Sequence, residues 1–327
     1  MKVALCTIAK LENRYIRDFV IYYMKLGIDH ITIYDNNDPN GEKIDPVISD
    51  LIRKGFVDII DVRGKKAYQM KAYEEYFKNN YDKYDWICYF DVDEYLYLVH
   101  DKNIKDYLSR PIFREYEIIH INWKIFDDND LLLYENIPVY KRFTRVATVK
   151  GKFGKDFPEN DHIKSIIRTT INKNQKFPNP HTIKGDDFSV CDNAGNKVKN
   201  EPFVHPANWK LAEIRHYQCK TIEEFCEIRL TRGRATTNGT HKIDQFKTLN
   251  QWTKDKEEIY NDFINLKNIQ KWKEKIRIRL TTNQSKNHQQ TKSLNEITNH
   301  STNTVVISQN SNMKDTKNSR KITVIKM

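Results

Sequence analysis

Short apolar segments with the length of strands alternate with longer, helix-like segments over the first hundred residues. The strand-like runs are rich in apolar, β-branched or aromatic residues and lie at 3–8, 30–34, 57–62 and 86–90. Apolar residues recur at helical spacing between them, at about 11–26, 47–52 and 68–77. Gly27 and Gly55 follow the first two of these segments and predict where the helices end. Such alternation indicates βαβ units, and therefore an α/β fold with a mostly parallel sheet whose ligands bind at the carboxyl ends of the strands.

The middle of the chain is harder to interpret because its patterns are weaker. Strands are predicted at 118–125 and 139–149, and loops or short strands at 172–206, which is rich in Pro, Asn, Lys and His. A charged amphipathic helix is predicted at 251–280, with a break near Leu266. We therefore expect a mixed region after the α/β half, followed by C-terminal helices.

Composition excludes several classes of protein. With 39% hydrophobic and 12% aromatic residues the chain can form a core, and no segment approaches the roughly 18 consecutive apolar residues of a membrane-spanning helix. The apolar run at Val3–Ala9 is too short for a secretory signal and is expected to form a buried first strand. Five scattered cysteines without a Cys-x-x-Cys pair argue against a disulfide framework or a zinc cluster. We expect a soluble, cytoplasmic protein.

The formal net charge of +11 favours partners that carry negative charge, such as phosphates or an anionic membrane surface. Residues 281–327 contain seven Lys and Arg against two Asp and Glu, so the rest of the chain is only modestly basic, and nucleic acid is not a predicted partner. The same segment holds 26 Ser, Thr, Asn and Gln among 47 residues and no aromatic residue. This composition predicts a polar tail without a folded core, in spite of two apolar islands at 305–307 and 322–325. Contact of the tail with a membrane or a partner is the alternative.

The strongest chemical signal is the acidic segment Asp91-Val92-Asp93-Glu94, directly after the strand at 86–90. Residues two apart on a strand point to the same face, so Asp91 and Asp93 are expected to converge. Two ionised carboxylates at close range repel each other and need a cation, and a hard divalent ion with oxygen ligands fits this need. The alternative is a turn whose acids cap a helix or remain solvated. The position at the carboxyl end of a central strand favours the metal.

A second polar turn, Asp35-Asn36-Asn37, also follows a predicted strand. Its side chains can hydrogen-bond a ribose or a base at the same edge of the sheet. Asn and Asp also form turns for their own sake, and the residues alone favour that simpler interpretation.

His216 lies at the end of a strand predicted at Glu213–Gln218. Thr221 and Glu224 then have the spacing of a capping box, which begins a helix running to about Arg232 and Gly233. A lone histidine is more often structural than a ligand. The histidine is surrounded in the sequence by basic residues suited to a diphosphate, although most of them are expected to lie on a solvated helix face. These residues are Lys210, Arg215, Lys220, Arg229, Arg232 and Arg234.

These motifs belong to a recognisable series. In the first half the series comprises Lys10-x-Glu12, Tyr15-Ile16, Leu26-Gly27, Ile33 to Asn37, Gln69, Ala72-Tyr73, Asp85 to Ile87 and Phe90 to Glu94. In the second half it comprises Asn122-Trp123, Phe126, Asp128-Asn129, Lys164 to Ile166, Pro180-His181, Arg215 to Tyr217, Lys220 and Arg232-Gly233. Over about residues 1–235 the chain resembles the bacterial GT-A glycosyltransferases grouped with families 2 and 92.

The resemblance implies a GT-A, Rossmann-like fold in which Asp91 and Asp93 hold Mn²⁺ or Mg²⁺ against the diphosphate of a nucleotide sugar. It also implies that Asp35 contacts the nucleoside and that His216 lies near the metal or the diphosphate. The predicted donor-binding residues are Asp35, Asn36, Gln69, Asp91, Arg215 and Lys220, and the predicted metal ligands are Asp91, Asp93 and His216.

The predicted activity is transfer of a sugar, with a UDP-sugar favoured as donor, to a hydroxyl group of a surface glycan of the lipopolysaccharide or capsule type. The resemblance implies inversion at the anomeric carbon, so a carboxylate must accept the proton of the acceptor. Asp128 is the predicted base, Asp127 its rival and Glu94 a third candidate. Relatives often have a small residue in place of Asp127, which leaves open which carboxylate faces the acceptor. The alternatives are a metal-dependent nucleotidyltransferase and a non-catalytic polyanion-binding protein that uses the basic tail.

Four regions are predicted along the chain. Residues 1–110 form the nucleotide-sugar-binding half and 111–235 the acceptor side of the same domain. C-terminal helices follow at 236–280, and the polar tail occupies 281–327. The inner face of the membrane is a possible place of action.

Overall fold

The structure is a computed structural model, and it describes residues 1–148, 159–232, 241–266, 268–279 and 281–282. The chain divides into two compact units, Met1–Ile269 and Gln270–Met327. In the second unit residues 270–279 are helical, and the predicted polar tail, with its apolar islands, lies outside the described residues from 283 onward. None of the described helices combines the length and the apolar composition that crossing a membrane requires.

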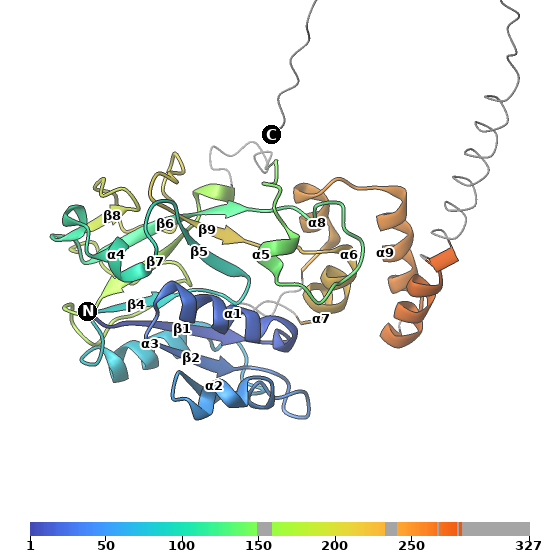
Figure 1. Ribbon diagram of the computed structural model, residues 1–327, viewed down its shortest axis with the longest axis horizontal. Coiled ribbons are helices and arrows are strands. Elements are labelled where there is room, and N and C mark those ends of the chain that lie inside the picture. The colour runs from blue at the N-terminus through green and yellow to red at the C-terminus, as the bar shows by residue number, and fades with distance from the viewer. Residues whose placement is uncertain (149–158, 233–240, 267, 280, 283–327) are drawn as a thin grey trace, which may run out of the picture. The chain divides into compact units, whose positions relative to one another are not determined.

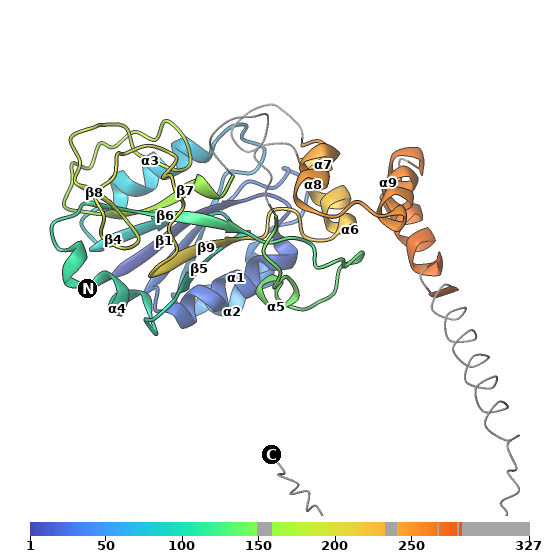
Figure 2. The same cartoon turned by 90° about the horizontal axis from the view of Figure 1, so that it is seen from above.

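Four parallel strands form the first half of the sheet in the first unit. They are β1 (Val3–Ala9), β2 (His30–Asp35), β3 (Val57–Asp61) and β4 (Trp86–Tyr89), in the spatial order β3-β2-β1-β4. The helices between them are α1 (Asn13–Leu26), α2 (Ser49–Arg53), preceded by a 3₁₀ turn (Asp45–Ile48), and α3 (Gln69–Asn80). Figures 1 and 2 show α1 and α2 on one face of the sheet and α3 on the other. All four strands therefore end at one edge of the sheet, where their carboxyl-terminal turns meet.

The second half of the sheet is mixed. Its strands are β5 (Glu94–Leu98), β6 (Ile118–Ile125), β7 (Ile163–Arg168), β8 (Val190–Asp192) and β9 (Ala212–His216). The order continues β4-β7-β6-β9-β5, with β7 antiparallel to both of its neighbours, β9 parallel to β6, and β8 paired to β6. Five of the eight strand pairings are parallel, which confirms the predicted α/β class with a mostly parallel sheet.

Five short helices and the longer α9 lie in the rest of the described part of the first unit. They are α4 (Ile104–Leu108), α5 (Val139–Arg142), α6 (Ile222–Glu224), α7 (Leu230–Arg232), α8 (Ile243–Leu249) and α9 (Lys254–Leu266). A π-helical turn (Phe225–Arg229) joins α6 to α7, and 3₁₀ turns lie at Pro111–Phe113 and Glu159–Asp161. The end of α9 at Leu266 agrees with the break predicted there.

Aromatic side chains fill the space between α1 and the sheet. Phe19 and Tyr23, one turn apart on α1, are fully buried, and their ring centroids lie 4.8 Å apart. The helix ends at Gly27, whose φ of 96° is a left-handed conformation that glycine adopts without strain. On the opposite face α3 buries Tyr73 and Phe77 in a second core cluster. The apolar residues that recur at helical spacing in α1 and α3 are thus buried against the sheet and form two cores, one on each of its faces.

One predicted strand is wrong. Residues 139–149 were expected to be extended, but Val139–Arg142 forms the helix α5, and residue 149 lies outside the described residues. Pro138 stands directly before α5 with a ψ of 137°, and proline at the start of a helix costs no hydrogen bond. Val139 and Phe143, four residues apart, are both buried, so these two apolar residues lie on the same side of a single helical turn. The strands β5 and β7 and the helix α4 were not predicted, whereas α8 lies within the region 236–280 where C-terminal helices were expected.

Candidate active site

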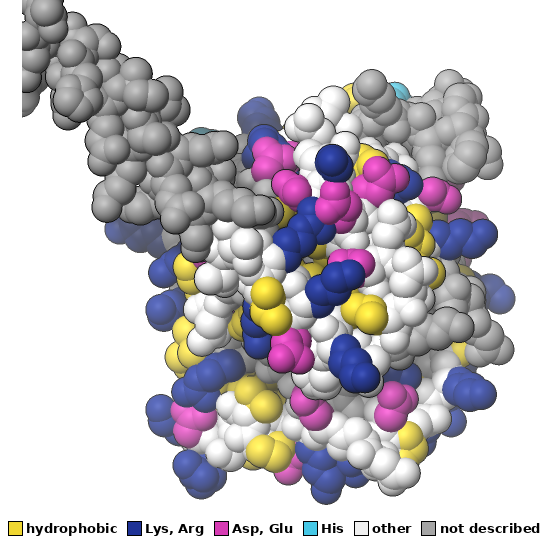
Figure 3. Space-filling view, turned by 90° about the vertical axis from the view of Figure 1, so that its right-hand side faces the viewer, with side chains coloured by type: hydrophobic (Ala, Val, Ile, Leu, Met, Phe, Trp, Pro, Cys, Tyr) yellow, Lys and Arg dark blue, Asp and Glu magenta, His cyan; other side chains and the backbone are white. Residues whose placement is uncertain are grey.

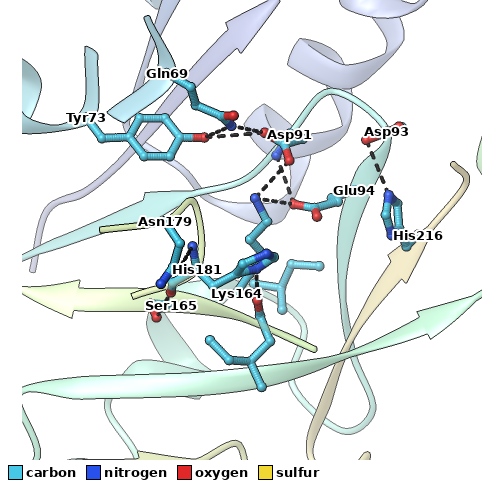
Figure 4. Close-up of polar contacts among 12 residues, drawn as sticks. Gln69, Tyr73, Asp91, Asp93, Glu94, Lys164, Ser165, Asn179, His181 and His216 are labelled. Carbon is cyan, nitrogen blue, oxygen red and sulfur yellow. Dashed lines mark hydrogen bonds and ion pairs between the residues drawn. The ribbon is translucent and has the colours of Figure 1, made fainter. Parts of the chain in front are cut away.

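The acidic segment forms a turn at the carboxyl end of β4. β4 ends at Tyr89 and β5 begins at Glu94, whose backbone N–H donates to the carbonyl of Asp91 at 3.0 Å. Because Asp91 and Asp93 lie in a turn and not on a strand, the rule that alternate residues share a face does not apply to them. Figure 4 shows the Asp91 carboxylate directed toward Gln69 and Lys164, and the Asp93 carboxylate directed toward His216.

Asp91 is held by side chains from α3 and β7. Gln69 and Tyr73 on α3 donate to Asp91 Oδ1 at 2.7 and 3.3 Å, and Lys164 Nζ lies 2.9 Å from Oδ2. Lys164 Nζ also lies 3.3 Å from Glu94 Oε2, and neither Lys164 nor Glu94 has any exposed side-chain surface. The Asp91 side chain is 32% exposed, so it is the member of this group that a ligand can reach.

Lys164 supplies positive charge where two carboxylates meet. Burial by itself lowers the pKa of Lys164, but the charges of Asp91 and Glu94 outweigh this and leave that pKa raised. Burial raises the pKa of Glu94 well above its usual value, in spite of Lys164. The repulsion expected from the acidic segment is therefore relieved at Asp91 and Glu94 by an amino group of the chain itself.

Asp93 is paired separately. Arg229 Nη2 donates to Asp93 Oδ2 at 2.7 Å, and His216 Nε2 lies 3.6 Å from Oδ1. Burial would raise the pKa of Asp93, but Arg229 and His216 hold it well below the usual range. Lys220 adds to this field, so Asp93 is ionised and surrounded by cations.

A capping box places Arg229. The Thr221 hydroxyl accepts from the Glu224 backbone N–H, and the Glu224 carboxylate accepts from the Thr221 backbone N–H, which confirms the motif read from the sequence. Glu224 is also held by both terminal nitrogens of Arg142 at 2.8 Å. The helical segment that begins here delivers Arg229 to Asp93 and Arg232 to Glu12.

Removal of this cap has a measurable cost. Thr221→Ala is expected to lower the free energy of unfolding by about 1 kcal/mol, because one backbone N–H loses its acceptor. The control is Thr231→Ala on α7, an exposed residue, which we expect to stay within about 0.5 kcal/mol of the wild type. Urea unfolding of both variants measures the difference, and equal values for the two would contradict the assigned cap.

The donor types at the site fit a hard divalent ion. Two carboxylates and one imidazole are available in Asp91, Asp93 and His216, and His216 Nδ1 is buried with no hydrogen-bond partner in the described part of the chain. Among the described residues, however, no three such side chains already lie close enough to hold an ion. An ion would therefore need further oxygen ligands, which a diphosphate can provide.

The first polar turn holds itself together. Asp35 is 2% exposed, and its two oxygens accept from the backbone N–H groups of Asn37 and Ile44 at 3.0 and 3.1 Å. The Asn36 amide donates to the carbonyls of Val62 and Lys65. Both side chains thus perform the turn-forming role that the residues alone favoured, and their contact with a nucleoside stays a prediction.

The two predicted cations beside His216 are placed differently. Lys220, with a φ of 56°, is buried with its amino group 4.5 Å above the Tyr15 ring, near enough to Asp93 to lower the pKa of that carboxyl. Arg215 precedes His216 on β9, so their side chains point to opposite faces. Its guanidinium pairs with Glu213 at 2.8 Å and stacks on Tyr97 at 3.6 Å. The structure therefore does not bring Arg215 together with Asp93.

The two predicted bases also lie in ion pairs. Asp128 has no exposed side-chain surface, and its Oδ2 lies 2.5 Å from Lys256 Nζ, which is equally buried. Burial raises the pKa of Asp128, while Lys256 opposes the rise. Asp127 pairs with Arg145 at 2.5 Å and is 9% exposed. In the described residues neither carboxylate shares a direct contact partner with Asp91.

Three contact residues were not assigned a role from the sequence. Lys164 lies on β7, a strand that was not predicted, and Lys256 lies on α9, more than a hundred residues from Asp128. Tyr73 was noted only as part of a motif, although it stands one helical turn after Gln69 and so faces the same way. That spacing, and the presence of Lys164 in the motif series, were the signals that the sequence offered.

One face of the described surface mixes both signs of charge. Figure 3 looks at the right-hand side of Figure 1, where α9 lies, and its described surface has basic and acidic side chains interspersed. Such a surface differs from the continuous basic face expected of a protein that binds polyanions by charge alone.

Comparison with known proteins gives a consistent result. The model of glycosyltransferase family 92 matches residues 2–230. A glycosyltransferase family 92 protein of Ricinus communis is 27% identical over 105 residues, which are 32% of this chain and 19% of that protein, so the chain spans only a small part of this relative's length.

Similar solved structures include glycosyltransferases of two organisms. TarS 1-349 of S. aureus has 12% identity and a TM-score of 0.37, with 70% of this chain and 63% of that chain covered. The mannosyltransferase PcManGT of Pyrobaculum calidifontis, in complex with GDP-Man and Mn²⁺, has 9% identity and a TM-score of 0.28, with 38% and 36% covered.

Proposed function

The chain belongs to glycosyltransferase family 92, and from this premise we propose that it transfers a sugar from a nucleotide-sugar donor to a hydroxyl group of a surface glycan. The observation that carries the proposal is the acidic turn at the carboxyl end of β4, with one carboxylate open to ligands and buried cations around it. Asp91 is 32% exposed, while Lys164 and Arg229 fix the charges behind it. Such an arrangement suits a ligand that combines phosphates with a metal ion.

The proposed metal is Mn²⁺ or Mg²⁺, with Asp91, Asp93 and His216 as its protein ligands. When bound, the ion supplies Lewis-acid stabilisation of the charge that develops on the leaving diphosphate. Gln69 orients Asp91 through its hydrogen bond of 2.7 Å. Arg229 and Lys220 contribute fixed positive charge on the side of Asp93.

Inversion at the anomeric carbon is part of the proposal, and it requires a carboxylate that removes the proton of the acceptor hydroxyl. Asp128 remains our choice, with Asp127 and Glu94 as rivals. Its pKa, raised by burial, makes Asp128 a better proton acceptor than an ordinary aspartate. For Asp128 to act as the base, the acceptor hydroxyl has to reach its carboxylate next to the ion pair with Lys256.

A UDP-sugar is the proposed donor, and a glycan of the lipopolysaccharide or capsule type is the proposed acceptor. We place the reaction in the cytoplasm, at the inner face of the membrane. Residues 281–327 contain more Lys and Arg than Asp and Glu, and this excess of positive charge supports attraction to an anionic membrane surface.

A thermal-shift panel tests the donor and the metal together. UDP-, GDP- and CMP-sugars are added to the full chain, each with and without Mn²⁺. A ligand present at a hundred times its Kd stabilises the folded state by about 2.7 kcal/mol, so the true donor should raise the midpoint, and more so with Mn²⁺.

Product analysis separates the proposal from a nucleotidyltransferase. A glycosyltransferase releases a nucleoside diphosphate from the donor that raises the midpoint. Release of pyrophosphate from a nucleoside triphosphate, or no response to any nucleotide sugar, would refute the proposed function.

A further inference from the structure

Five aromatic rings form a connected group beside the acidic turn, which we call the ring cluster: Trp123, His162, His181, Phe203 and His216. The Trp123 ring lies 4.7 Å from His162 in a stacked arrangement, 5.4 Å from His181 and 4.3 Å from His216, measured between centroids. His162 in turn lies 4.4 Å from Phe203. None of the roles proposed above uses Trp123, His162 or His181.

Sheet topology brings the ring cluster to the same edge as Asp91 and Asp93. Trp123 is near the end of β6, where it pairs with Ile214 of β9, and the preceding Asn122 pairs with Ile163 at the start of β7, which runs antiparallel to β4. At one end of the cluster His216 faces Asp93 at 3.6 Å. Close to its middle, His181 lies next to the Lys164 side chain that reaches Asp91 (Figure 4).

Two of the histidines are fixed in one tautomer. His162 Nδ1 is 3.0 Å from the carbonyl oxygen of Glu159, and His181 Nδ1 is 2.7 Å from that of Ile163. A carbonyl oxygen only accepts, so each Nδ1 carries the hydrogen. Burial lowers the pKa of both imidazoles, so both are neutral at pH 7 and Nε2 presents a lone pair. No partner for either Nε2 is found within the described residues.

The indole of Trp123 adds a donor. Its Nε1 is buried and has no hydrogen-bond partner in the described part of the chain. A buried donor without a partner is unfavourable, so the Trp123 N–H is a group that a bound hydroxyl oxygen can satisfy, in the same ring cluster as the two histidine acceptors. Trp123, His162 and His181 are only half-buried, and Phe203 is 37% exposed, so the cluster is open to solvent.

This combination selects one class of ligand. Neutral Nε2 acceptors pair with hydroxyl groups and not with phosphate oxygens, which have no hydrogen to donate at neutral pH. Aromatic faces favour an apolar surface, such as the C–H face of a sugar ring, and a few convergent polar groups fix its orientation.

We propose that the ring cluster binds the pyranose ring of a substrate, with His162 and His181 accepting hydrogen bonds from its hydroxyl groups. The proposal rests on the proposed glycosyl transfer and adds the site of the sugar to it. The ring can belong to the donor or to the acceptor, since both offer the same chemistry.

The test uses His162→Phe and His181→Phe in the full chain. Phenylalanine keeps a flat ring and removes the acceptor. The same substitution at His120, a fully buried histidine on β6 outside the cluster, controls for loss of stability. Calorimetric titration with UDP and with UDP-sugars, in the presence of Mn²⁺, measures donor binding. The KM for p-nitrophenyl glycosides at saturating donor measures acceptor binding.

If the ring is the donor's, UDP-sugar affinity falls about tenfold in both variants while UDP affinity is unchanged. If the ring is the acceptor's, the KM for the glycoside rises by a similar factor and donor binding is unchanged. His181→Gln, which returns an acceptor to the position, should restore part of the loss. Equal changes for UDP and UDP-sugar, or no change in either arm relative to His120→Phe, would overturn the proposal.

A second measurement keeps the inference separate from the proposed function. If the wild type binds no nucleotide sugar, that function fails, but the ring cluster can still be tested with methyl glucoside, galactoside and mannoside by saturation-transfer NMR. Signals that are present in the wild type and lost in both phenylalanine variants support the sugar site. Equal signals in all three proteins contradict it.

Discussion

Asp91→Asn is expected to reduce turnover by about 10²–10³-fold while the chain stays folded. Asparagine keeps an oxygen that can accept from Gln69 and Tyr73, but it loses the negative charge that a divalent ion requires. The Asp91 side chain is 32% exposed, and the fully buried Lys164 that it pairs with keeps the Glu94 carboxylate at 3.3 Å, so the substitution does not leave the buried amino group alone. We expect the midpoint shift caused by Mn²⁺ to disappear together with the activity.

Asp91 is a cleaner position for this test than Asp93. Asp93 is buried against Arg229, and its neutralisation would leave that guanidinium without a partner, so lost activity could reflect lost structure. Asp82→Asn, at an exposed position between α3 and β4, is the matched control and should retain full activity. Full metal-dependent turnover by Asp91→Asn would show that the acidic turn is not the metal site.

The parallel half of the fold was predictable because local patterns determine it. Apolar spacing located α1 and α3, and the glycine at position 27 located the end of α1. The mixed half depends on contacts between distant residues, which spacing does not reveal. At 139–149 the sequence is rich in β-branched and aromatic residues, as in a strand, but Pro138 and one turn of helix determined the structure.

The candidate site was predictable to a similar extent. The acidic segment was recognised because four consecutive residues carry the signal, whereas its counter-charges come from β7 and from the helical segment after Thr221. The place of Lys164 follows from strand order and that of Arg229 from the packing of a helical segment, and the sequence shows neither. The acidic segment alone therefore suggested a metal ion, although the chain also supplies its own cations. The placement of Arg215 could, by contrast, have been predicted, because successive residues on a strand such as β9 point to opposite faces, so Arg215 and His216 cannot face the same site.

Lys256→Met is expected to lower the free energy of unfolding by about 3–5 kcal/mol. Both side chains of this pair are fully buried, and the substitution leaves the Asp128 carboxylate with only a longer contact, 4.0 Å to Arg145, among the described residues. Lys254→Met on the same helix is the control. Lys254 is 89% exposed and its pair with Glu258 has an N–O distance of 3.9 Å, so we expect a change within about 0.5 kcal/mol. Urea unfolding distinguishes the two, and similar losses would contradict the buried ion pair.

The same pair decides whether Asp128 is the general base. Asp128→Asn combined with Lys256→Met removes both charges, so the double variant should regain much of the stability that Lys256→Met loses. If Asp128 takes the proton of the acceptor, the double variant is stable but its kcat remains at least about a hundredfold below that of the wild type. If the double variant is both stable and active, Asp128 only anchors α9, and the base is to be sought at Asp127 or Glu94. Measuring both kcat and the free energy of unfolding in the same variants therefore separates a catalytic role of Asp128 from its structural role in anchoring α9.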